Sequence, residues 1–199
     1  MTDAMNLNIA DFWQEQTRHH MEIAEKTFPV VTEPLVKWVE MAEEAVKNGK
    51  KLLFCGNGGS AADAQHISAE LSVKLCQDRA PIAAICLSLD PSAMTACAND
   101  YGYDQIFARQ VAAFGQEGDI LVGITTSGNS KNVIEAIEVA KKKGIKVVVL
   151  TGESGGKVAP IADLAIKVPC ADSTARIQEM HIFLGHAFCG ALENRLGLV

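Results

Sequence analysis

Two distant pairs of side chains have types and spacings that suit a metal ion. His66 and Glu70 are four residues apart, which places both on one face of a helix. Gln178 and His186 are eight residues apart, so they lie about 80° from each other on one broad stripe of a later helix. Two imidazoles, a carboxylate and an amide oxygen can complete a tetrahedral zinc site, but glutamine is an uncommon ligand and exposed His–Glu helix pairs are common. The prediction therefore requires that the two helices meet. The neighbouring His181 is expected to point elsewhere, as is Glu179.

Two glycine- and serine-rich segments suit an anion. Residues 55–60 read Cys-Gly-Asn-Gly-Gly-Ser, and residues 125–130 read Thr-Thr-Ser-Gly-Asn-Ser. Each stands between a predicted strand and a predicted helix, where glycine lets the backbone approach an anion and helix N–H groups donate to it. Tight turns and helix caps use the same residues. Because two such segments occupy equivalent places, we favour phosphate binding, with Ser127 and Ser130 at the entry of the second helix.

The first segment also fits a dinucleotide fingerprint of the form G-x-G-x-x-A, from Gly56 to Ala61. That fingerprint requires an acidic residue about 20 positions later, at the end of the second strand. The second strand is expected to end near Leu87, so Asp90 comes too late. No G-K-[ST] phosphate loop occurs either. The sequence therefore argues against NAD and gives no indication of ATP.

Short apolar runs alternate with helical stretches after residue 50, which predicts a parallel sheet covered on both faces. The fold class is therefore α/β, with a doubly wound five-stranded parallel sheet flanked by helices. We expect strands at 51–55, 81–87, 119–125, 145–150 and 164–168, and helices near 59–75, 91–97, 103–114, 130–143 and 173–195. No linker is evident, so residues 1–199 are expected to form a single domain.

Residues 1–50 are expected to form two extra helices ahead of the sheet. Apolar residues recur at helical spacing from Phe12 to Phe28, and Thr32 precedes Glu33-Pro34 as an N-cap would. Asn48-Gly49 is a typical helix stop. These helices are long for a lone domain, which suggests that they pack against another subunit.

Composition excludes several classes of protein. The formal net charge of −6 disfavours nucleic acid, and the basic run at 141–143 is explained by its place at a helix end. The six cysteines form no C-x-x-C pair, so no zinc knuckle is indicated. No apolar run approaches the roughly 20 residues that cross a bilayer, and no signal peptide is evident. We expect a soluble cytoplasmic protein with no disulfides, no membrane contact and no nucleic-acid partner.

Four motifs, in order along nearly the whole chain, resemble those of bacterial phosphoheptose isomerases with a SIS domain. They are CGNGGSAADAQHISAEL at 55–71, ANDYGY at 98–103, GITTSGNS at 123–130 and RIQEMHIFLGH at 176–186. The resemblance implies an enzyme that converts sedoheptulose 7-phosphate to D-glycero-D-manno-heptose 7-phosphate. It also implies a homotetramer with active sites between subunits, and a role in ADP- or GDP-heptose precursor synthesis for lipopolysaccharide or other surface glycans.

The same resemblance assigns residues to roles. One zinc per subunit is implied, held by His66, Glu70, Gln178 and His186. Substrate contacts are implied for Asn57, Gly58, Gly59, Ser60, Glu70, Asn99, Asp100, Thr125, Thr126, Ser127, Ser130 and Gln178. This chain departs from many members by having Lys74 in place of an arginine, and from some members by having Ala175 in place of an acid.

A ketose-to-aldose conversion moves a proton between adjacent carbons, usually through an enediol. We expect Glu70 and His186 to shuttle that proton. The two roles of Glu70 conflict, because a cation stabilises the ionised carboxylate and makes it a weaker base.

The sequence leaves two alternative functions open. One is a non-enzymatic SIS tetramer that binds a replication initiator, which would not need Glu70. The other is an enzyme or sensor for a different phosphosugar, because only the resemblance specifies a heptose.

Overall fold

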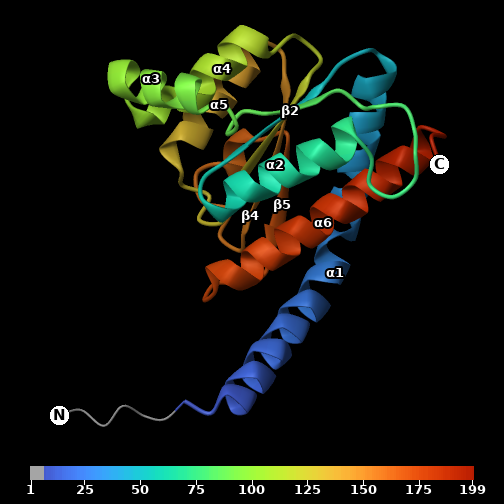
Figure 1. The fold of residues 1–199 in the computed structure, drawn as a ribbon, viewed down its shortest axis with the longest axis vertical. Helices are drawn as coiled ribbons and strands as arrows, with labels where there is room; N and C mark the ends of the chain where they lie inside the picture. Colours follow the sequence, from blue (N-terminus) through green and yellow to red (C-terminus); the bar gives the residue numbers. More distant parts are fainter. Residues whose placement is uncertain (1–6) are drawn as a thin grey trace.

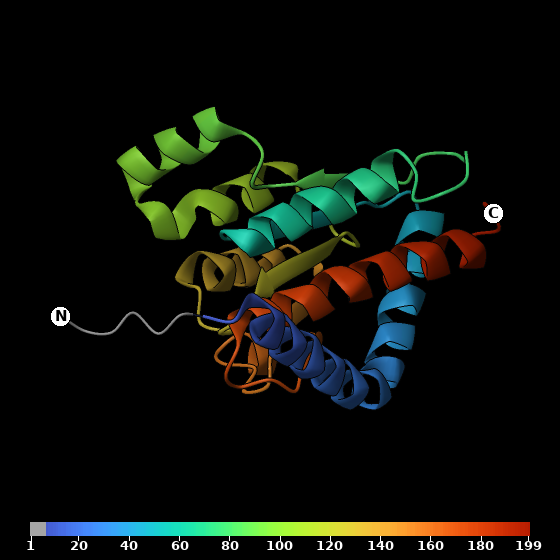
Figure 2. The same cartoon turned by 60° about the horizontal axis from the view of Figure 1, so that its bottom comes forward.

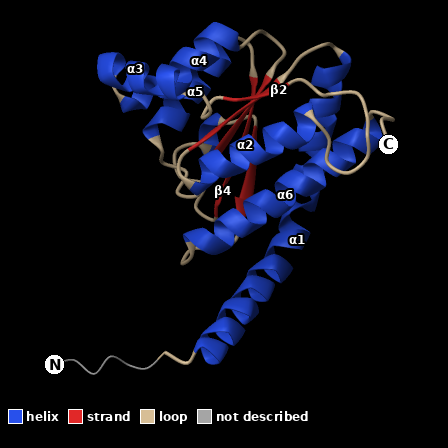
Figure 3. Ribbon diagram, in the orientation of Figure 1, coloured by secondary structure: helices blue, strands red, loops and turns tan. Residues whose placement is uncertain are grey.

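The computed structural model describes residues 7–199 as a parallel sheet between two layers of helices (Figures 1 and 3). The strands are β1 (Leu52–Gly56), β2 (Ala84–Cys86), β3 (Ile120–Thr125), β4 (Lys146–Gly152) and β5 (Leu164–Val168). They lie in the order β2-β1-β3-β4-β5, and every neighbouring pair is parallel. The predicted doubly wound five-stranded sheet is confirmed.

The helices are α1 (Ile9–Lys47), α2 (Gly59–Ser72), α3 (Pro91–Tyr101), α4 (Ile106–Phe114), α5 (Lys131–Lys142) and α6 (Thr174–Arg195). Short 3-10 turns, η1 (Tyr103–Gln105) and η2 (Ala159–Ile161), complete the described elements. Helices α1, α2 and α6 pack together on one side of the sheet, whereas α3, α4 and α5 pack together on the other (Figure 1). Each layer buries its own apolar core against the sheet.

The strand order places the expected ligand site. In sheets of this order, the chain reverses direction across the sheet between β1 and β3, and ligands bind beyond the carboxyl ends of the strands at that point. Strands β1 and β3 are hydrogen-bonded neighbours, with Gly56 opposite Ile124. The two glycine-rich segments therefore leave the sheet side by side at this reversal.

The prediction of two N-terminal helices was wrong, because a single helix, α1, contains both Pro29 and Pro34. A proline inside a helix costs roughly 3 kcal/mol or more. Packing offsets this cost: Trp38 is fully buried and stacks on Phe188 of α6, with ring centroids 3.7 Å apart. Figure 2 shows α1 changing direction part-way along, which is the kink expected of an internal proline.

Thr32 is consequently not an N-cap. Its hydroxyl donates 2.8 Å to the carbonyl of Phe28 inside the helix. The helix does stop where the sequence indicated, at Asn48.

Two further boundaries differ from prediction. Strand β2 keeps only Ala84–Cys86 of the expected 81–87, because Pro81 lacks an N–H and this edge strand pairs with β1 alone. Helix α3 continues to Tyr101 and ends at Gly102, whose φ of +89° suits glycine. Asn99 and Asp100 therefore lie in the last turn of a helix rather than in a loop.

Candidate active site

Helices α2 and α6 lie side by side and bring two of the predicted histidines together (Figure 1). His66 Nε2 lies 2.9 Å from His186 Nε2 and 3.2 Å from Glu70 Oε1. Two bonds of about 2.0–2.1 Å at a tetrahedral angle hold ligand atoms about 3.3 Å apart. The three side chains of this α2–α6 cluster therefore stand at separations that suit one zinc-sized ion, and their donor set suits zinc.

A glycine permits this approach of α2 and α6. A Cβ added to Gly185, the residue before His186, would lie 2.6 Å from Ile67 Cγ1 and clash with it. Ile67 is fully buried and follows His66 directly. The contact between Gly185 and Ile67 thus sets how closely the two histidines can meet.

Gln178 lies at the other end of the same helix pair. A Cβ added to Gly59, the first residue of α2, would lie 2.6 Å from the Gln178 Oε1 atom. The side chain of Gln178 therefore packs directly against the first glycine-rich segment. As expected, Glu179 points elsewhere and pairs with His20 of α1 at 2.6 Å.

His181 is fully buried on the sheet side of α6. It points away from the α2–α6 cluster, as expected. Its Nε2 lies 3.3 Å from the carbonyl oxygen of Thr151, so this nitrogen carries the proton. Burial lowers the pKa of His181 to about 4, which keeps the ring neutral.

The first segment is held by the side chain of Asn57. Its Nδ2 donates to Asn132 Oδ1 at 2.9 Å, and Asn132 Nδ2 donates back to Asn57 Oδ1 at 2.8 Å. The Tyr103 hydroxyl donates to the same Asn57 Oδ1 at 3.0 Å. Asn57 thereby ties the β1–α2 turn to the first turn of α5 and to the segment that follows Asn99 and Asp100.

The neighbouring residues of the first segment hold its turn. Gly58 has a φ of +56°, which favours glycine, and Ser60 is buried in the first turn of α2. Asn99 donates 2.8 Å to Asp100, and both side chains are exposed.

The second segment presents hydroxyls at the start of α5. Thr125 Oγ1 and Ser130 Oγ share a hydrogen bond of 2.9 Å, and Ser127 Oγ accepts from the backbone N–H of Asn129 at 3.1 Å. The hydroxyl of Ser130 does not cap the helix, and the N–H of Val133 donates to the Ser130 carbonyl, so the N–H groups of Lys131 and Asn132 are the ones placed to donate to a ligand. This arrangement suits a phosphate group.

Thr126 and Ser127 also line a hollow beside the start of α6. The opposite wall includes Ser173, Thr174 and Ile177. Sequence reasoning missed these wall residues and Asn132. The small polar pair Ser173-Thr174 stands between a strand and a helix like the two segments above, so that pattern could have indicated it. No local signal distinguishes Asn132 from an ordinary residue of a first helical turn.

The two departures from the family pattern differ in surroundings. Lys74 is exposed just beyond α2, and Ala175 is exposed in the first turn of α6. The buried cation of this region is Arg79, which pairs with Glu193 at 2.7 Å and donates to the carbonyls of Glu70 and Leu71. Arg79 therefore satisfies the C-terminal carbonyls of the helix that carries Glu70.

Comparison with known proteins shows the family of this chain. The family model described as SIS domain matches residues 15–152. The chain is 49% identical over 186 residues to a phosphoheptose isomerase of Helicobacter pylori, covering 94% of this chain and 96% of the relative. It is 50% identical over 177 residues to that of Aliarcobacter butzleri, covering 89% and 93%. This chain belongs to the phosphoheptose isomerase family of SIS-domain proteins.

Solved structures of the family have the same fold. The phosphoheptose isomerase of Neisseria gonorrhoeae superimposes with a TM-score of 0.88 at 42% identity, covering 94% of this chain and all of that chain. That of Francisella tularensis gives a TM-score of 0.91 at 36% identity, with the same coverage. The predicted SIS fold is confirmed.

Proposed function

We propose that this protein is a phosphoheptose isomerase that converts sedoheptulose 7-phosphate to D-glycero-D-manno-heptose 7-phosphate. The observation that carries the proposal is the identity of about half the residues, over nearly the whole chain, to phosphoheptose isomerases. It favours an aldose–ketose isomerase over the non-enzymatic binding platform. The product would enter ADP- or GDP-heptose precursor synthesis for lipopolysaccharide or other surface glycans.

The substrate would be anchored by its phosphate at the start of α5. Thr125, Thr126, Ser127 and Ser130 supply hydroxyls there, beside the free N–H groups of the helix. Binding energy from this remote group would position the reacting carbons. The remaining substrate contacts are proposed for Asn57, Gly58, Gly59, Ser60, Glu70, Asn99, Asp100 and Gln178.

Glu70 and His186 would move the protons of the reaction. One takes a proton from C1 of the open-chain ketose to give an enediol, and a proton is then delivered to C2 while the C1 oxygen becomes the aldehyde. Both side chains lie in the α2–α6 cluster, and Glu70 is mostly buried, with 19% of its side chain exposed. A carboxylate in that position is shielded from water but still reaches the cluster surface.

The same cluster would hold one zinc ion per subunit through His66, Glu70 and His186. Gln178, the fourth ligand that the family resemblance implies, packs against Gly59 at the other end of the helix pair, so its side chain would have to turn toward the cluster to bind the ion. When bound, such an ion supplies a positive charge that stabilises negative charge on the sugar oxygens. The fit rests on the close approach of the two imidazole nitrogens and the carboxylate.

A homotetramer with active sites between subunits is proposed from the apolar surface of α1. Its N-terminal half extends away from the sheet (Figure 1) and leaves Phe12, Trp13, Met21 and Phe28 exposed. Phe183 of α6 is exposed beside Phe28, with ring centroids 5.2 Å apart. An apolar patch of this kind marks an interaction surface.

We place the enzyme in the cytoplasm as a single SIS domain spanning residues 1–199. The structure shows all six cysteines free, as expected for a reducing compartment. Among residues 7–199, no helix is long and apolar enough to cross a membrane.

The function is tested by incubating the purified protein and zinc with sedoheptulose 7-phosphate and following the aldose product. Ketose phosphates of five, six and seven carbons should be compared in parallel, and the seven-carbon substrate should have the highest kcat/KM. A preference for a shorter sugar would make the protein a different phosphosugar isomerase. Absence of turnover on every substrate would favour the binding platform.

A further inference from the structure

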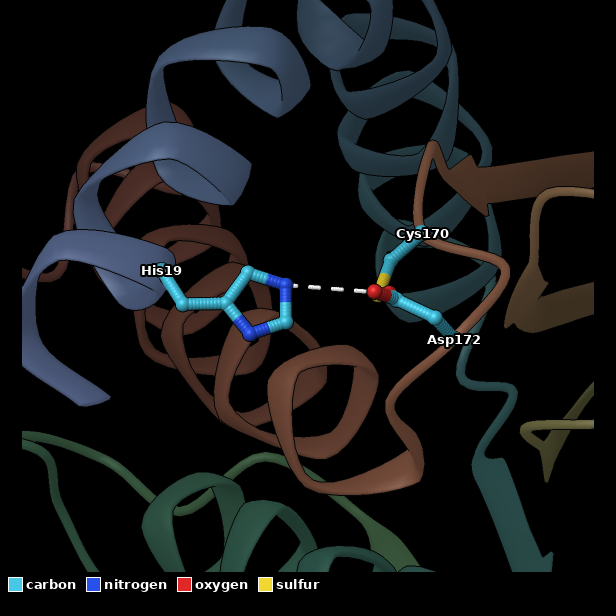
Figure 4. Close-up of side chains that lie close together, drawn as sticks. All are labelled: His19, Cys170 and Asp172. Atoms are coloured by element: carbon cyan, nitrogen blue, oxygen red, sulfur yellow. Dashed lines mark hydrogen bonds and ion pairs between the residues drawn. The ribbon is translucent and has the colours of Figure 1, made fainter. Parts of the chain in front are cut away.

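A second group of metal-capable side chains lies away from the α2–α6 cluster, between α1 and the segment that joins β5 to α6 (Figure 4). It consists of His19 on α1 with Cys170 and Asp172 on the joining segment. Their ligand atoms all lie within 4.8 Å of one another. His19 Nε2 is 3.6 Å from Asp172 Oδ1, and the thiol of Cys170 donates to the same oxygen at 3.3 Å.

The donor set of this group is chemically selective. An imidazole, a thiol and a carboxylate together suit a borderline cation such as Zn²⁺ or Co²⁺, whereas Mg²⁺ and Ca²⁺ prefer oxygen ligands alone. The sulfur belongs to a residue that is only 3% exposed, while the Asp172 side chain is 74% exposed. The group is therefore anchored on its protein side and open to solvent on the other, which leaves room for a water as fourth ligand.

The surroundings carry an excess of negative charge. A hollow beside the group is lined by the acidic residues Glu15, Glu22, Glu153 and Asp172 and by the basic residues Arg18 and Lys26. Arg18 is already engaged in ion pairs with both Glu15 and Glu22. The acids outnumber the bases, so the local field favours a cation.

We propose that His19, Cys170 and Asp172 bind a zinc-type divalent cation as a second metal site. The ion joins α1 to the start of α6, the helix that carries Gln178 and His186. A local turn ahead of α6 would by itself explain the contact between Cys170 and Asp172. It would not explain why the imidazole of His19, on α1, lies at the same point. Binding at this site stabilises the folded chain, because the three ligands come together only when α1 packs against α6.

The site is tested by titrating Co²⁺ into the metal-free full-length protein and recording the near-ultraviolet band of thiolate-to-cobalt charge transfer. The α2–α6 cluster contains no sulfur, so cobalt bound there does not contribute to this band. The wild type should develop the band and saturate at about one thiolate-bound cobalt per chain. The Cys170→Ser variant should lose it, while Cys76→Ser, a matched change at an exposed cysteine, should keep it.

His19→Asn and Asp172→Asn should each weaken the cobalt affinity read from this band by about 10-fold or more. Far-ultraviolet circular dichroism checks that the variants are folded. These two positions are partly or largely exposed, so they carry the test if Cys170→Ser does not fold. The proposal is overturned if the wild type gives no band, if Cys170→Ser retains it, or if both His19→Asn and Asp172→Asn bind cobalt as the wild type does.

Discussion

Two loop–helix units leave neighbouring strands of the sheet, yet only α2 brings a histidine and a carboxylate into a cluster with a side chain of a second helix. Helix α5 follows β3, and its inner face of Val133, Ala136, Ile137 and Ala140 is fully buried as cover for the sheet. Its chemistry is confined to its first turn. Helix α2 follows β1 and packs on the sheet beside α6, with His66 and Glu70 on its accessible side.

The difference comes from what covers each helix. Helix α5 contacts α4 and the sheet, and its outward side is charged and solvated. Helix α2 contacts α6, which brings a second set of polar side chains to it. In this account the α5 unit anchors phosphate and the α2 unit performs the chemistry, because only α2 has a helical partner that carries functional groups.

The largest expected effect is a loss of turnover on replacing the carboxylate of α2. Glu70→Gln should lower kcat for sedoheptulose 7-phosphate by about 10²–10⁴-fold, the usual contribution of a positioned acid or base. Steady-state kinetics measure the effect, and zinc content is assayed in parallel. The same change on α5, Glu138→Gln, lies on an exposed face and should leave kcat unchanged. Near-normal turnover of Glu70→Gln would remove this residue as the base.

Acid should destabilise the layer that holds α2 and α6. The His181 pKa is about 4 in the fold against 6.5 for the free side chain, so the unfolded state binds more protons between these values. The free energy of unfolding should therefore fall as pH drops from 6.5 to 4, by up to about 3 kcal/mol from this group. Urea unfolding at several pH values measures this slope.

The matched variant His181→Asn keeps an N–H donor but does not titrate in this range. Its unfolding free energy should depend less on pH between 6.5 and 4 than that of the wild type. Equal slopes for the two proteins would show that His181 does not make this contribution.

The distance between α2 and α6 should control the zinc affinity of the α2–α6 cluster, even when its ligand residues are unchanged. Gly185→Ala places a methyl group against Ile67 and should weaken zinc binding by about 10- to 100-fold, as loss of ligand positioning does. Gly190 lies further along α6, where an added Cβ meets only Leu75 at an ordinary 3.5 Å. Competition titration with a chelating dye should thus find Gly190→Ala close to the wild type. Similar losses in both variants would contradict the role given to the helix spacing.

The smallest effect is expected at the anchoring unit. Ser130→Ala removes one hydroxyl at the start of α5 and should raise KM by about 10-fold, the worth of one hydrogen bond to a charged group. Its kcat should fall less than that of Glu70→Gln. A large loss of kcat with KM unchanged would place Ser130 in the chemical step and break the division between the two units.

Much of this arrangement could be predicted from local patterns. The short apolar runs predicted all five strands. The alternation of strands and helices predicted that each glycine-rich segment joins the end of a strand to a helix. The paired spacings of His66 with Glu70 and of Gln178 with His186 depend only on helix geometry. Whether the two helices meet depends on Gly185 fitting against Ile67, which is a tertiary contact that no spacing reveals.

The features that the sequence did not predict also depend on tertiary contacts. Pro29 and Pro34 locally favour a break, but the burial of Trp38 against Phe188 outweighs it and keeps α1 continuous. The group of His19, Cys170 and Asp172 joins residues from nearly opposite ends of the chain, so no short sequence motif contains it. Asn132 gains its role only from the reciprocal amide pair with Asn57.

The most direct test of the account is to run the isomerisation in deuterium oxide with zinc present and examine the heptose 7-phosphate by NMR. Proton transfer by Glu70 and His186 through an enediol predicts solvent deuterium at C2 of the product, and deuterated product should form about 10²–10⁴-fold more slowly when Glu70→Gln replaces the wild type. Product that forms at the normal rate entirely without deuterium would instead indicate direct hydride transfer between the carbons, and would contradict the assignment of proton transfer to the α2–α6 cluster.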